Sequence, residues 1–151
     1  MELTVEIDRW PLSRPFKIAY HTFTQRDLLR VELHRDGVIG RGEAGGHPQL
    51  EAIETARQRV LDLREEIVNG MSREELLQRM PRGPARNAVD CAMWDHEAKS
   101  ADRRVWALAG LPDPEPKLTA YTIGVASLSD MVAEALRMHE FPLLKLKVDG
   151  E

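Results

Sequence analysis

Cysteine is nearly absent from this 151-residue sequence, in which Cys91 is the only one. A single thiol excludes an internal disulfide and a multi-cysteine metal site. No apolar run approaches the roughly 20 residues that span a bilayer, and the N-terminus MELTVEIDRW lacks the basic and apolar regions of a signal peptide. Positive charge is not in excess either, because the formal net charge is -4. We therefore expect a cytoplasmic protein that binds neither nucleic acid nor a membrane.

The N-terminal third of the chain has the pattern of a small antiparallel β-meander. Residues 3–9 and 28–35 alternate apolar and polar side chains, as half-buried strands do. Two prolines that follow residue 9 are expected to break the first strand. Asp36-Gly37 is a two-residue hairpin signal, so the chain is expected to return as a third strand over 38–43.

From about residue 49 the apolar period becomes helical. Asn69-Gly70 is expected to end the first helical stretch. Ser72 and Glu75 fit a capping box at the start of the next helix, and the alanine-rich residues 85–101 predict the strongest helix of the chain. One apolar stripe at spacings of three and four is expected to face the core. It consists of Ile53, Ala56, Val60, Leu63 and Ile67.

The C-terminal part of the chain begins with a linker. Residues 111–117 are rich in proline and charge, which is typical of a linker. Residues 118–125 and 142–148 predict strands, and Ser129 is expected to cap a helix between them. A strand, a helix and a strand form a βαβ unit with parallel strands. Because one such unit leaves edges and faces uncovered, this segment looks like the beginning of a larger α/β domain.

Lys145 and Lys147 are the residues that point most clearly to chemistry. They stand at positions i and i+2 of the last strand, so both side chains are expected on one face. In a βα barrel such a face points inward, and lysines near the strand end would lie at the mouth of the active site. Neighbouring cations and burial lower a lysine pKa toward neutrality, which suits a general base. The alternative is an edge strand whose lysines discourage aggregation.

Four motifs follow one another along the chain. They are WPLSRPFKIAYHT (10–22), GRGEA (40–44), RNAVDCAMWD (86–95) with VWALAGL (105–111), and LLKLKVDGE (143–151). Together, in this order and spacing, they resemble the muconate-lactonizing subgroup of the enolase superfamily along essentially the whole chain. The resemblance implies an α+β fold. An enolase-like N-terminal capping domain, an antiparallel β-meander followed by helices, is expected over 1–112, and the first βαβ unit of an incomplete, TIM-like (β/α) barrel over 117–151.

Two further stretches, PRGPARNAVDCAMWD (81–95) and TAYTIG (119–124), are similar to the dipeptide epimerases of the L-Ala-D/L-Glu type. This resemblance implies an isomerase that removes the α-proton of a small dipeptide or carboxylate and stabilises the enolate with Mg²⁺. It implies that Lys147 is the acid-base group on one face of the α-carbon and that Lys145 is an auxiliary cation. Thr122 takes the position of a substrate-binding threonine, and the alternative is an ordinary β-branched strand residue.

The resemblance also implies two loops that cover the substrate, at about 19–26 and 45–50. In the Ala-Glu enzymes an arginine of the first loop pairs with the side-chain carboxylate of the substrate. Here Tyr20, His21 and Phe23 surround that position, with an arginine a little further on. We expect these three residues to bind substrate and to favour a more apolar or differently charged dipeptide. A solvated loop histidine is the alternative interpretation of His21.

The printed sequence ends directly after the lysine strand, before the three acidic metal ligands and the second catalytic lysine of the enzymes that it resembles. We therefore expect Mg²⁺ as cofactor of the complete enzyme, with no ligand in this chain, and no activity of this chain alone. Residues 118–148 are expected to be poorly ordered or buried against another chain. That burial would come from a homo-oligomer or from pairing of the exposed segment.

Other functions stay open on the sequence alone. Within the same subgroup they are muconate cycloisomerase, o-succinylbenzoate synthase and acid racemase. In a different class, the chain could be a free-standing, non-catalytic binding or assembly domain. The two stretches that are similar to dipeptide epimerases favour the isomerase.

Overall fold

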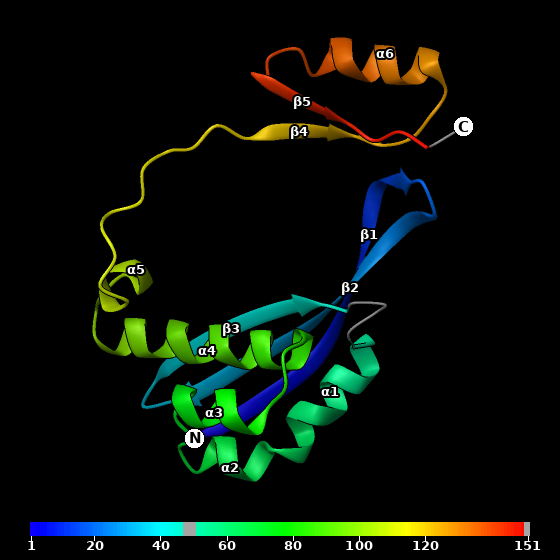
Figure 1. The fold of residues 1–151 in the computed structure, drawn as a ribbon. Coiled ribbons are helices and arrows are strands. Elements are labelled where there is room, and N and C mark those ends of the chain that lie inside the picture. The colour runs from blue at the N-terminus through cyan, green and yellow to red at the C-terminus, as the bar shows by residue number, and fades with distance from the viewer. Residues whose placement is uncertain (47–50, 150–151) are drawn as a thin grey trace. The chain divides into compact units, whose positions relative to one another are not determined.

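The computed structural model describes residues 1–46 and 51–149 and contains two compact units (Figure 1). Residues 11–26 belong with the C-terminal part of the chain, an association that the sequence analysis did not predict. Most of the second predicted loop, at 45–50, lies outside the described residues. Among the described helices, none is long and apolar enough to cross a membrane. The first unit comprises Met1–Trp10 and Asp27–Asp113, and the second comprises Pro11–Arg26 and Pro114–Glu151.

The predicted β-meander is confirmed as a three-stranded sheet. It has the order β1 (Glu2–Ile18), β2 (His21–Arg35) and β3 (Val38–Gly45). β2 and β3 are antiparallel, and their hairpin turns at Asp36-Gly37, where both residues have positive φ, at 52° and 77°. This backbone matches the right-handed twist of the two strands, and it explains why an Asp-Gly pair predicts the turn.

The prediction that the prolines end the first strand was wrong. β1 continues through Pro11 and Pro15 to Ile18, and β2 already begins at His21, so the loop expected over 19–26 is reduced to a two-residue turn. The carbonyl oxygen of Lys17 accepts a hydrogen bond from the N–H of Val125, so the backbone groups of Lys17 point away from β2. Pro11 and Pro15 stand an even number of positions before Lys17, so their backbone groups point to the same side. Their missing N–H groups therefore face the free edge of β1, where a strand tolerates proline.

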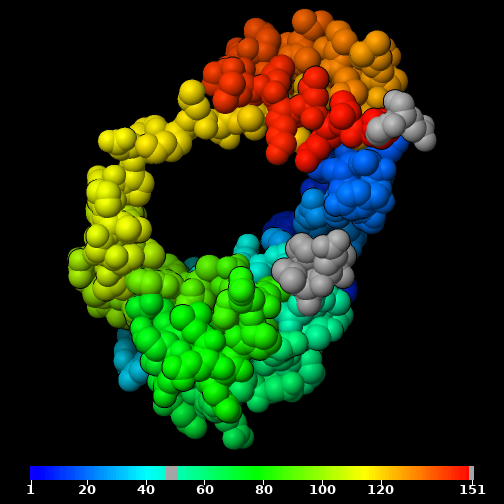
Figure 2. All heavy atoms as spheres, in the orientation of Figure 1, coloured from blue at the N-terminus to red at the C-terminus, as the bar shows by residue number. Residues whose placement is uncertain are grey.

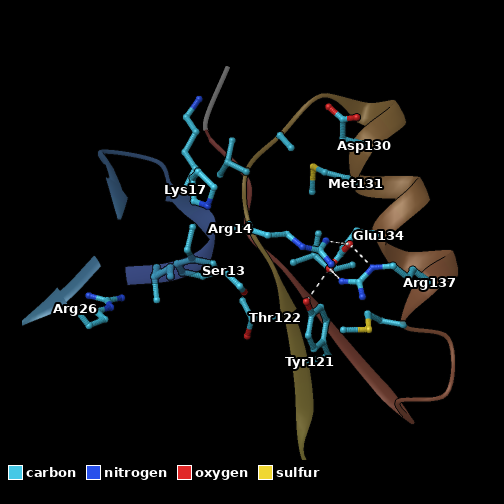
Figure 3. A pocket seen from close by; sticks show the side chains of 18 residues that line it. Ser13, Arg14, Lys17, Arg26, Tyr121, Thr122, Asp130, Met131, Glu134 and Arg137 are labelled. Atoms are coloured by element: carbon cyan, nitrogen blue, oxygen red, sulfur yellow. Dashed lines mark hydrogen bonds and ion pairs between the residues drawn. The ribbon is translucent and has the colours of Figure 1, made fainter. Parts of the chain in front are cut away.

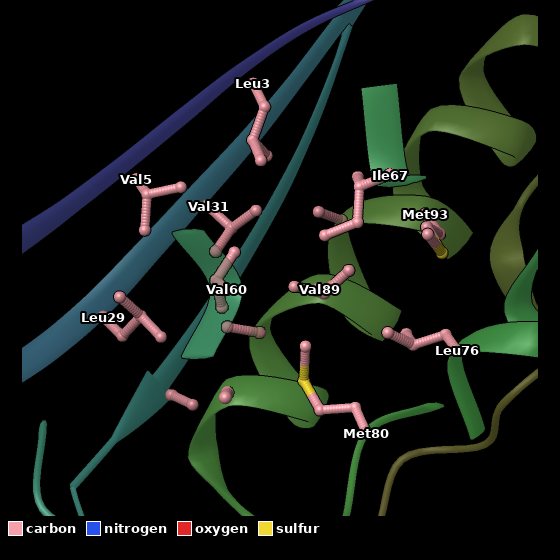
Figure 4. Packing of buried hydrophobic residues seen from close by; sticks show 14 of the residues in the cluster. Leu3, Val5, Leu29, Val31, Val60, Ile67, Leu76, Met80, Val89 and Met93 are labelled. Carbon is pink, nitrogen blue, oxygen red and sulfur yellow. The ribbon is translucent and has the colours of Figure 1, made fainter. Parts of the chain in front are cut away.

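The core of the first unit lies between this sheet and the helices that follow it (Figure 4). The predicted apolar stripe is confirmed, because Ala56, Val60 and Ile67 are fully buried. The stripe belongs to two helices, since the first ends at Asp62. The capping box of Ser72 is also confirmed. The helices are α1 (Ile53–Asp62), α2 (Arg64–Val68), α3 (Arg73–Arg79), α4 (Pro84–Ser100) and α5 (Val105–Leu108).

The glycines of the GRGEA motif allow β3 to approach α4 closely. A Cβ atom on Gly42 would lie 2.6 Å from the backbone nitrogen of Ala92, and closer still to the carbonyl oxygen of Ala88. Gly40 stands equally close to the same helix, on the backbone of Ala92 and on His96. The alanines of α4 and these glycines therefore allow the backbones of β3 and α4 to approach without intervening side chains. Close packing thus accounts for the small residues in the GRGEA motif (40–44) and in the RNAVDCAMWD motif (86–95).

The predicted βαβ unit is confirmed in the second unit. β4 (Ala120–Ile123) and β5 (Leu143–Leu146) form a parallel pair, connected through α6 (Leu128–Arg137). The prediction that Ser129 caps this helix was wrong. The cap is Ser127, whose hydroxyl accepts a hydrogen bond from the backbone N–H of Asp130 at 3.2 Å.

Many apolar side chains of the βαβ unit are exposed to solvent. In the space-filling view, the atoms of α6 and β5 (orange and red) lie at the surface (Figure 2). A sheet of two parallel strands normally has both faces covered. That another chain covers these residues stays a prediction. The exposed side chains include Leu128, Val132, Leu136, Leu143, Leu146 and Val148.

Candidate functional site

One face of the parallel pair carries the three strand residues that the sequence singled out. Thr122 and Lys145 are register partners on β4 and β5, so their side chains lie on the same face. The neighbouring Tyr121 donates a hydrogen bond to α6 and therefore points to the opposite side of β4 (Figure 3). Lys147 follows the end of β5 on the Lys145 side, and its backbone N–H donates to the carbonyl of Ile123 at 2.9 Å.

These three side chains therefore turn away from the covering helix, at and just beyond the carboxyl end of the strand pair. Lys145 is exposed, whereas Thr122 and Lys147 are half-buried. In α/β proteins with parallel sheets, ligands bind at the carboxyl ends of the strands. Two ammonium groups beside a hydroxyl can bind a carboxylate or carbonyl oxygen and can exchange a proton with a nearby carbon acid.

The hairpin between β1 and β2 carries the predicted substrate-binding aromatics. Tyr20 stands in the turn and is 87% exposed. The rings of His21 and Phe23 meet edge to face with centroids 4.3 Å apart, and the guanidinium of Arg26 lies 3.7 Å from the centre of the Phe23 ring. A cation stacked in this way gains a modest attraction from the ring. The arginine that the sequence placed further along the chain thus lies against the aromatic residues of the hairpin.

A hollow of about 600 Å³ lies within the second unit (Figure 3). Its walls come from residues 12–17 of β1, from residues 121–126 that include the end of β4, and from α6. Thr122 and Arg26 take part in its lining, whereas the two lysines and the three aromatic residues of the hairpin do not. The structure therefore brings only part of the predicted site to this hollow.

Four polar side chains that the sequence analysis missed meet at one wall of the hollow. The carboxylate of Glu134 on α6 accepts a hydrogen bond from the Tyr121 hydroxyl at 2.7 Å and from Nη1 of Arg14 at 3.0 Å. Nε of Arg137 donates to the same carboxylate at 2.9 Å. These bonds, that of Arg137 first, lower the pKa of Glu134 to about 2, and the same carboxylate raises the pKa of Tyr121.

The sequence held only a partial signal for this cluster. Glu134 and Arg137 stand three residues apart, a spacing that favours pairing on a helix. Nothing local indicates that Arg14, placed between two prolines, reaches the same carboxylate, because the two residues are 120 positions apart.

Acid is expected to break this cluster only well below neutral pH. A carboxylate whose pKa is lowered by folding stabilises the folded state above its ordinary value of 4.5, and this contribution is lost as the pH falls toward about 2. The carboxyl carbon shift of Glu134, assigned with a Glu134→Gln variant, should therefore titrate near 2. A midpoint near 4.5 would contradict the cluster.

Residues 1–46 and 51–149 contain no group of three His, Cys, Asp or Glu side chains that could hold a metal ion. The described part of the chain therefore does not fit a divalent cation that needs three acidic ligands. The candidate functional groups of the described residues are therefore Thr122, Lys145, Lys147 and the side chains of the β1–β2 hairpin.

Comparison with a protein family gives a match over most of the chain. Residues 1–110 match the family model described as the N-terminal domain of mandelate racemase / muconate lactonizing enzyme. A curated relative, L-Ala-D/L-Glu epimerase of Escherichia coli, is 32% identical over 146 residues, which are 95% of this chain and 46% of the relative. The chain thus spans about half the length of the curated relative.

Two solved structures have the same fold. An enolase family member from Agrobacterium tumefaciens, described as homologous to dipeptide epimerases and bound to sodium and L-Ala-L-Glu, is 34% identical with a TM-score of 0.90 over 97% of this chain and 45% of its own. A dipeptide epimerase from Cytophaga hutchinsonii, complexed with Mg and D-Ala-L-Val, is 25% identical with a TM-score of 0.83, and the match covers the whole of this chain and 45% of that one.

Proposed function

This chain belongs to the mandelate racemase / muconate lactonizing enzyme family of the enolase superfamily, and from this we propose that it is the N-terminal part of a dipeptide epimerase. The observation that carries the proposal is the shared face of Thr122, Lys145 and Lys147 at the carboxyl end of two parallel strands. The relatives named above act on or bind dipeptides, which supports this substrate class.

In the proposed reaction, Lys147 takes the proton from the α-carbon of one residue of the dipeptide, or returns it, on one face of that carbon. Lys145 adds positive charge beside the developing enolate oxygen, and the Thr122 hydroxyl donates a hydrogen bond to the substrate. Positioned donors and cations stabilise such a charge without having to reorganise. A second acid-base group on the opposite face, which epimerisation requires, would come from another part of a longer protein.

Mg²⁺ is the cofactor proposed for the complete enzyme, in which it would polarise the substrate carboxylate or carbonyl. The described residues of this chain offer no set of ligands for it. We therefore assign its binding to the remainder of a protein of the relatives' length. In this proposal, the chain supplies the amine of Lys147 that takes or returns the proton and the strand that positions this amine.

The hairpin residues Tyr20, His21 and Phe23 are proposed to contact the variable side chain of the dipeptide. The guanidinium of Arg26 on the Phe23 ring adds a cation to this group. The cation of Arg26 would suit an acidic side chain of the dipeptide, and the aromatic rings would suit an apolar one. As part of the same proposal, residues 1–112 form a capping domain and residues 117–151 begin a barrel domain.

Deuterium uptake tests the proposed function. In deuterated water, a protein of the relatives' full length is expected to introduce deuterium at an α-carbon of Ala-Glu or Ala-Val dipeptides. The 151-residue chain alone is expected to introduce none, because its described residues offer lysines on one face and no metal site. Proton NMR of the α-position measures both. Uptake with the pure chain would overturn its predicted inactivity, and lactonisation of muconate by the full-length protein without dipeptide exchange would favour a cycloisomerase.

A further inference from the structure

The far part of the β1–β2 hairpin, within residues 11–26, is attached to the βαβ unit at two points, one on α6 and one just after the end of β4. The first is the polar cluster, in which Arg14 reaches the carboxylate of Glu134 at 3.0 Å. The second is a backbone hydrogen bond, which the N–H of Val125 donates to the carbonyl of Lys17 at 3.0 Å. Lys17 stands three residues before Tyr20, so the second attachment lies close to the turn of the hairpin.

The backbone attachment needs a close approach of two chains. A Cβ atom on Gly124 would lie 3.0 Å from the carbonyl oxygen and 3.4 Å from the nitrogen of Lys17. On either side of this glycine, Ile123 and Val125 are buried, with 3% and 8% exposure. The backbone at Lys17 is therefore closely packed against residues 123–125, at the carboxyl end of the strand that carries Thr122.

The polar attachment is preorganised on the side of the βαβ unit. Tyr121 and Arg137 both come from that unit and hold the carboxylate of Glu134 in place. Arg14 is the donor that comes from the hairpin. Because two donors already orient the carboxylate, the ion pair with Arg14 forms with less loss of side-chain freedom than an isolated surface pair.

We propose that Glu134 and Arg14 form a latch that holds the hairpin turn over the carboxyl end of β4, and that both are positioning residues for substrate binding. The latch would keep Tyr20 and its neighbours in place relative to Thr122. The role of the latch in substrate binding rests on the proposed function. The attachment of the hairpin to the βαβ unit can be tested without any measurement of activity.

Amide hydrogen exchange in the 151-residue chain tests the attachment. Arg14→Met is expected to speed exchange of the Val125 N–H by about two- to fivefold, the effect of losing one exposed ion pair. The Lys147 N–H, which bonds to Ile123 between β4 and β5, is the internal control and should keep its rate. Arg14→Lys is expected to restore part of the protection, because lysine keeps the charge.

The matched control variant is Arg79→Met, which removes an exposed pair with Glu66 in the first unit. It should leave the Val125 N–H unchanged. Glu134→Gln should speed exchange at least as much as Arg14→Met does, and the double variant should not exceed Glu134→Gln, because that change already removes the ion pair with Arg14. Equal exchange of Val125 in the wild-type chain and in both single variants would overturn the latch.

A spectroscopic test reports on the Glu134 carboxylate, the half of the latch that lies in the βαβ unit. The chain has two tyrosines, so a Tyr20→Phe background leaves the Tyr121 phenol as the only one. Its ultraviolet titration should lie above the ordinary pKa of 10, because the Glu134 carboxylate raises it. Glu134→Gln should return it toward that value. A Tyr121 titration that Glu134→Gln leaves unchanged overturns the cluster, whereas absence of dipeptide exchange in a full-length protein would refute only the proposed function.

Discussion

Replacing Lys147 with methionine in a protein of the relatives' full length is expected to slow exchange of the substrate α-proton by about 10²- to 10⁴-fold. Methionine keeps an unbranched apolar stem and removes the ammonium group that we propose as acid and base. Lys147 directly follows β5 on the face of Thr122 and Lys145. The loss should be large because the described strands place no third lysine on this face that could take over its role. Deuterium uptake by each pure epimer of the dipeptide, followed by proton NMR, measures the effect.

The two epimers should respond differently. If Lys147 serves one face of the α-carbon, exchange is lost for the epimer whose proton points to it and persists for the other. Lys117→Met is the matched control, since the Lys117 side chain in the linker is 80% exposed and pairs with Glu115 at 3.4 Å. Unchanged exchange with both epimers would show that Lys147 is not a base in this reaction.

Gly42→Ala is expected to destabilise the first unit by about 3 kcal/mol or more. The new methyl group would overlap the carbonyl of Ala88 and would lie 2.6 Å from the backbone nitrogen of Ala92. These are backbone atoms of α4, so they cannot rotate away as the end of a side chain could. The strand and the helix would have to move apart, which opens the core that they share.

Urea unfolding followed by circular dichroism measures this loss of stability. Gly45→Ala is the matched control on the same strand, because the nearest atom that its Cβ would meet among the described residues is Cδ2 of Leu28, at an ordinary distance of 3.8 Å. We expect that control to change the free energy of unfolding by less than about 0.5 kcal/mol. If both variants unfold at the same urea concentration, the close approach at Gly42 does not limit the packing.

The fold was predictable wherever a local pattern determines the structure. The Asp36-Gly37 turn follows from the backbone preferences of two residues, and the Ser72 cap from a three-residue spacing. The βαβ unit follows from apolar strands on either side of a helix. Each of these signals lies within a few residues of the feature that it predicts.

The structure differs from the sequence-based expectation where a distant partner decides the local conformation. Pro11 and Pro15 read as strand breakers, and only the position of β1 at the edge of the sheet makes them tolerable. Arg14 and Glu134 are 120 residues apart, so no local pattern predicts their pairing. For the site, strand alternation predicted that Lys145 and Lys147 share a face. Neither the register that pairs Thr122 with Lys145 nor the stacking of a guanidinium on the hairpin ring was predicted.

The two prolines of β1 also protect the chain against a hazard of sheet proteins. An edge strand with free N–H and carbonyl groups is a template on which a strand of another molecule can add, the first step toward aggregates. At Pro11 and Pro15 this edge offers no N–H, and beyond them the Lys17 carbonyl is already bonded within the chain. The residues that looked like interruptions of the strand thus remove two backbone donors that a foreign strand would need at this edge.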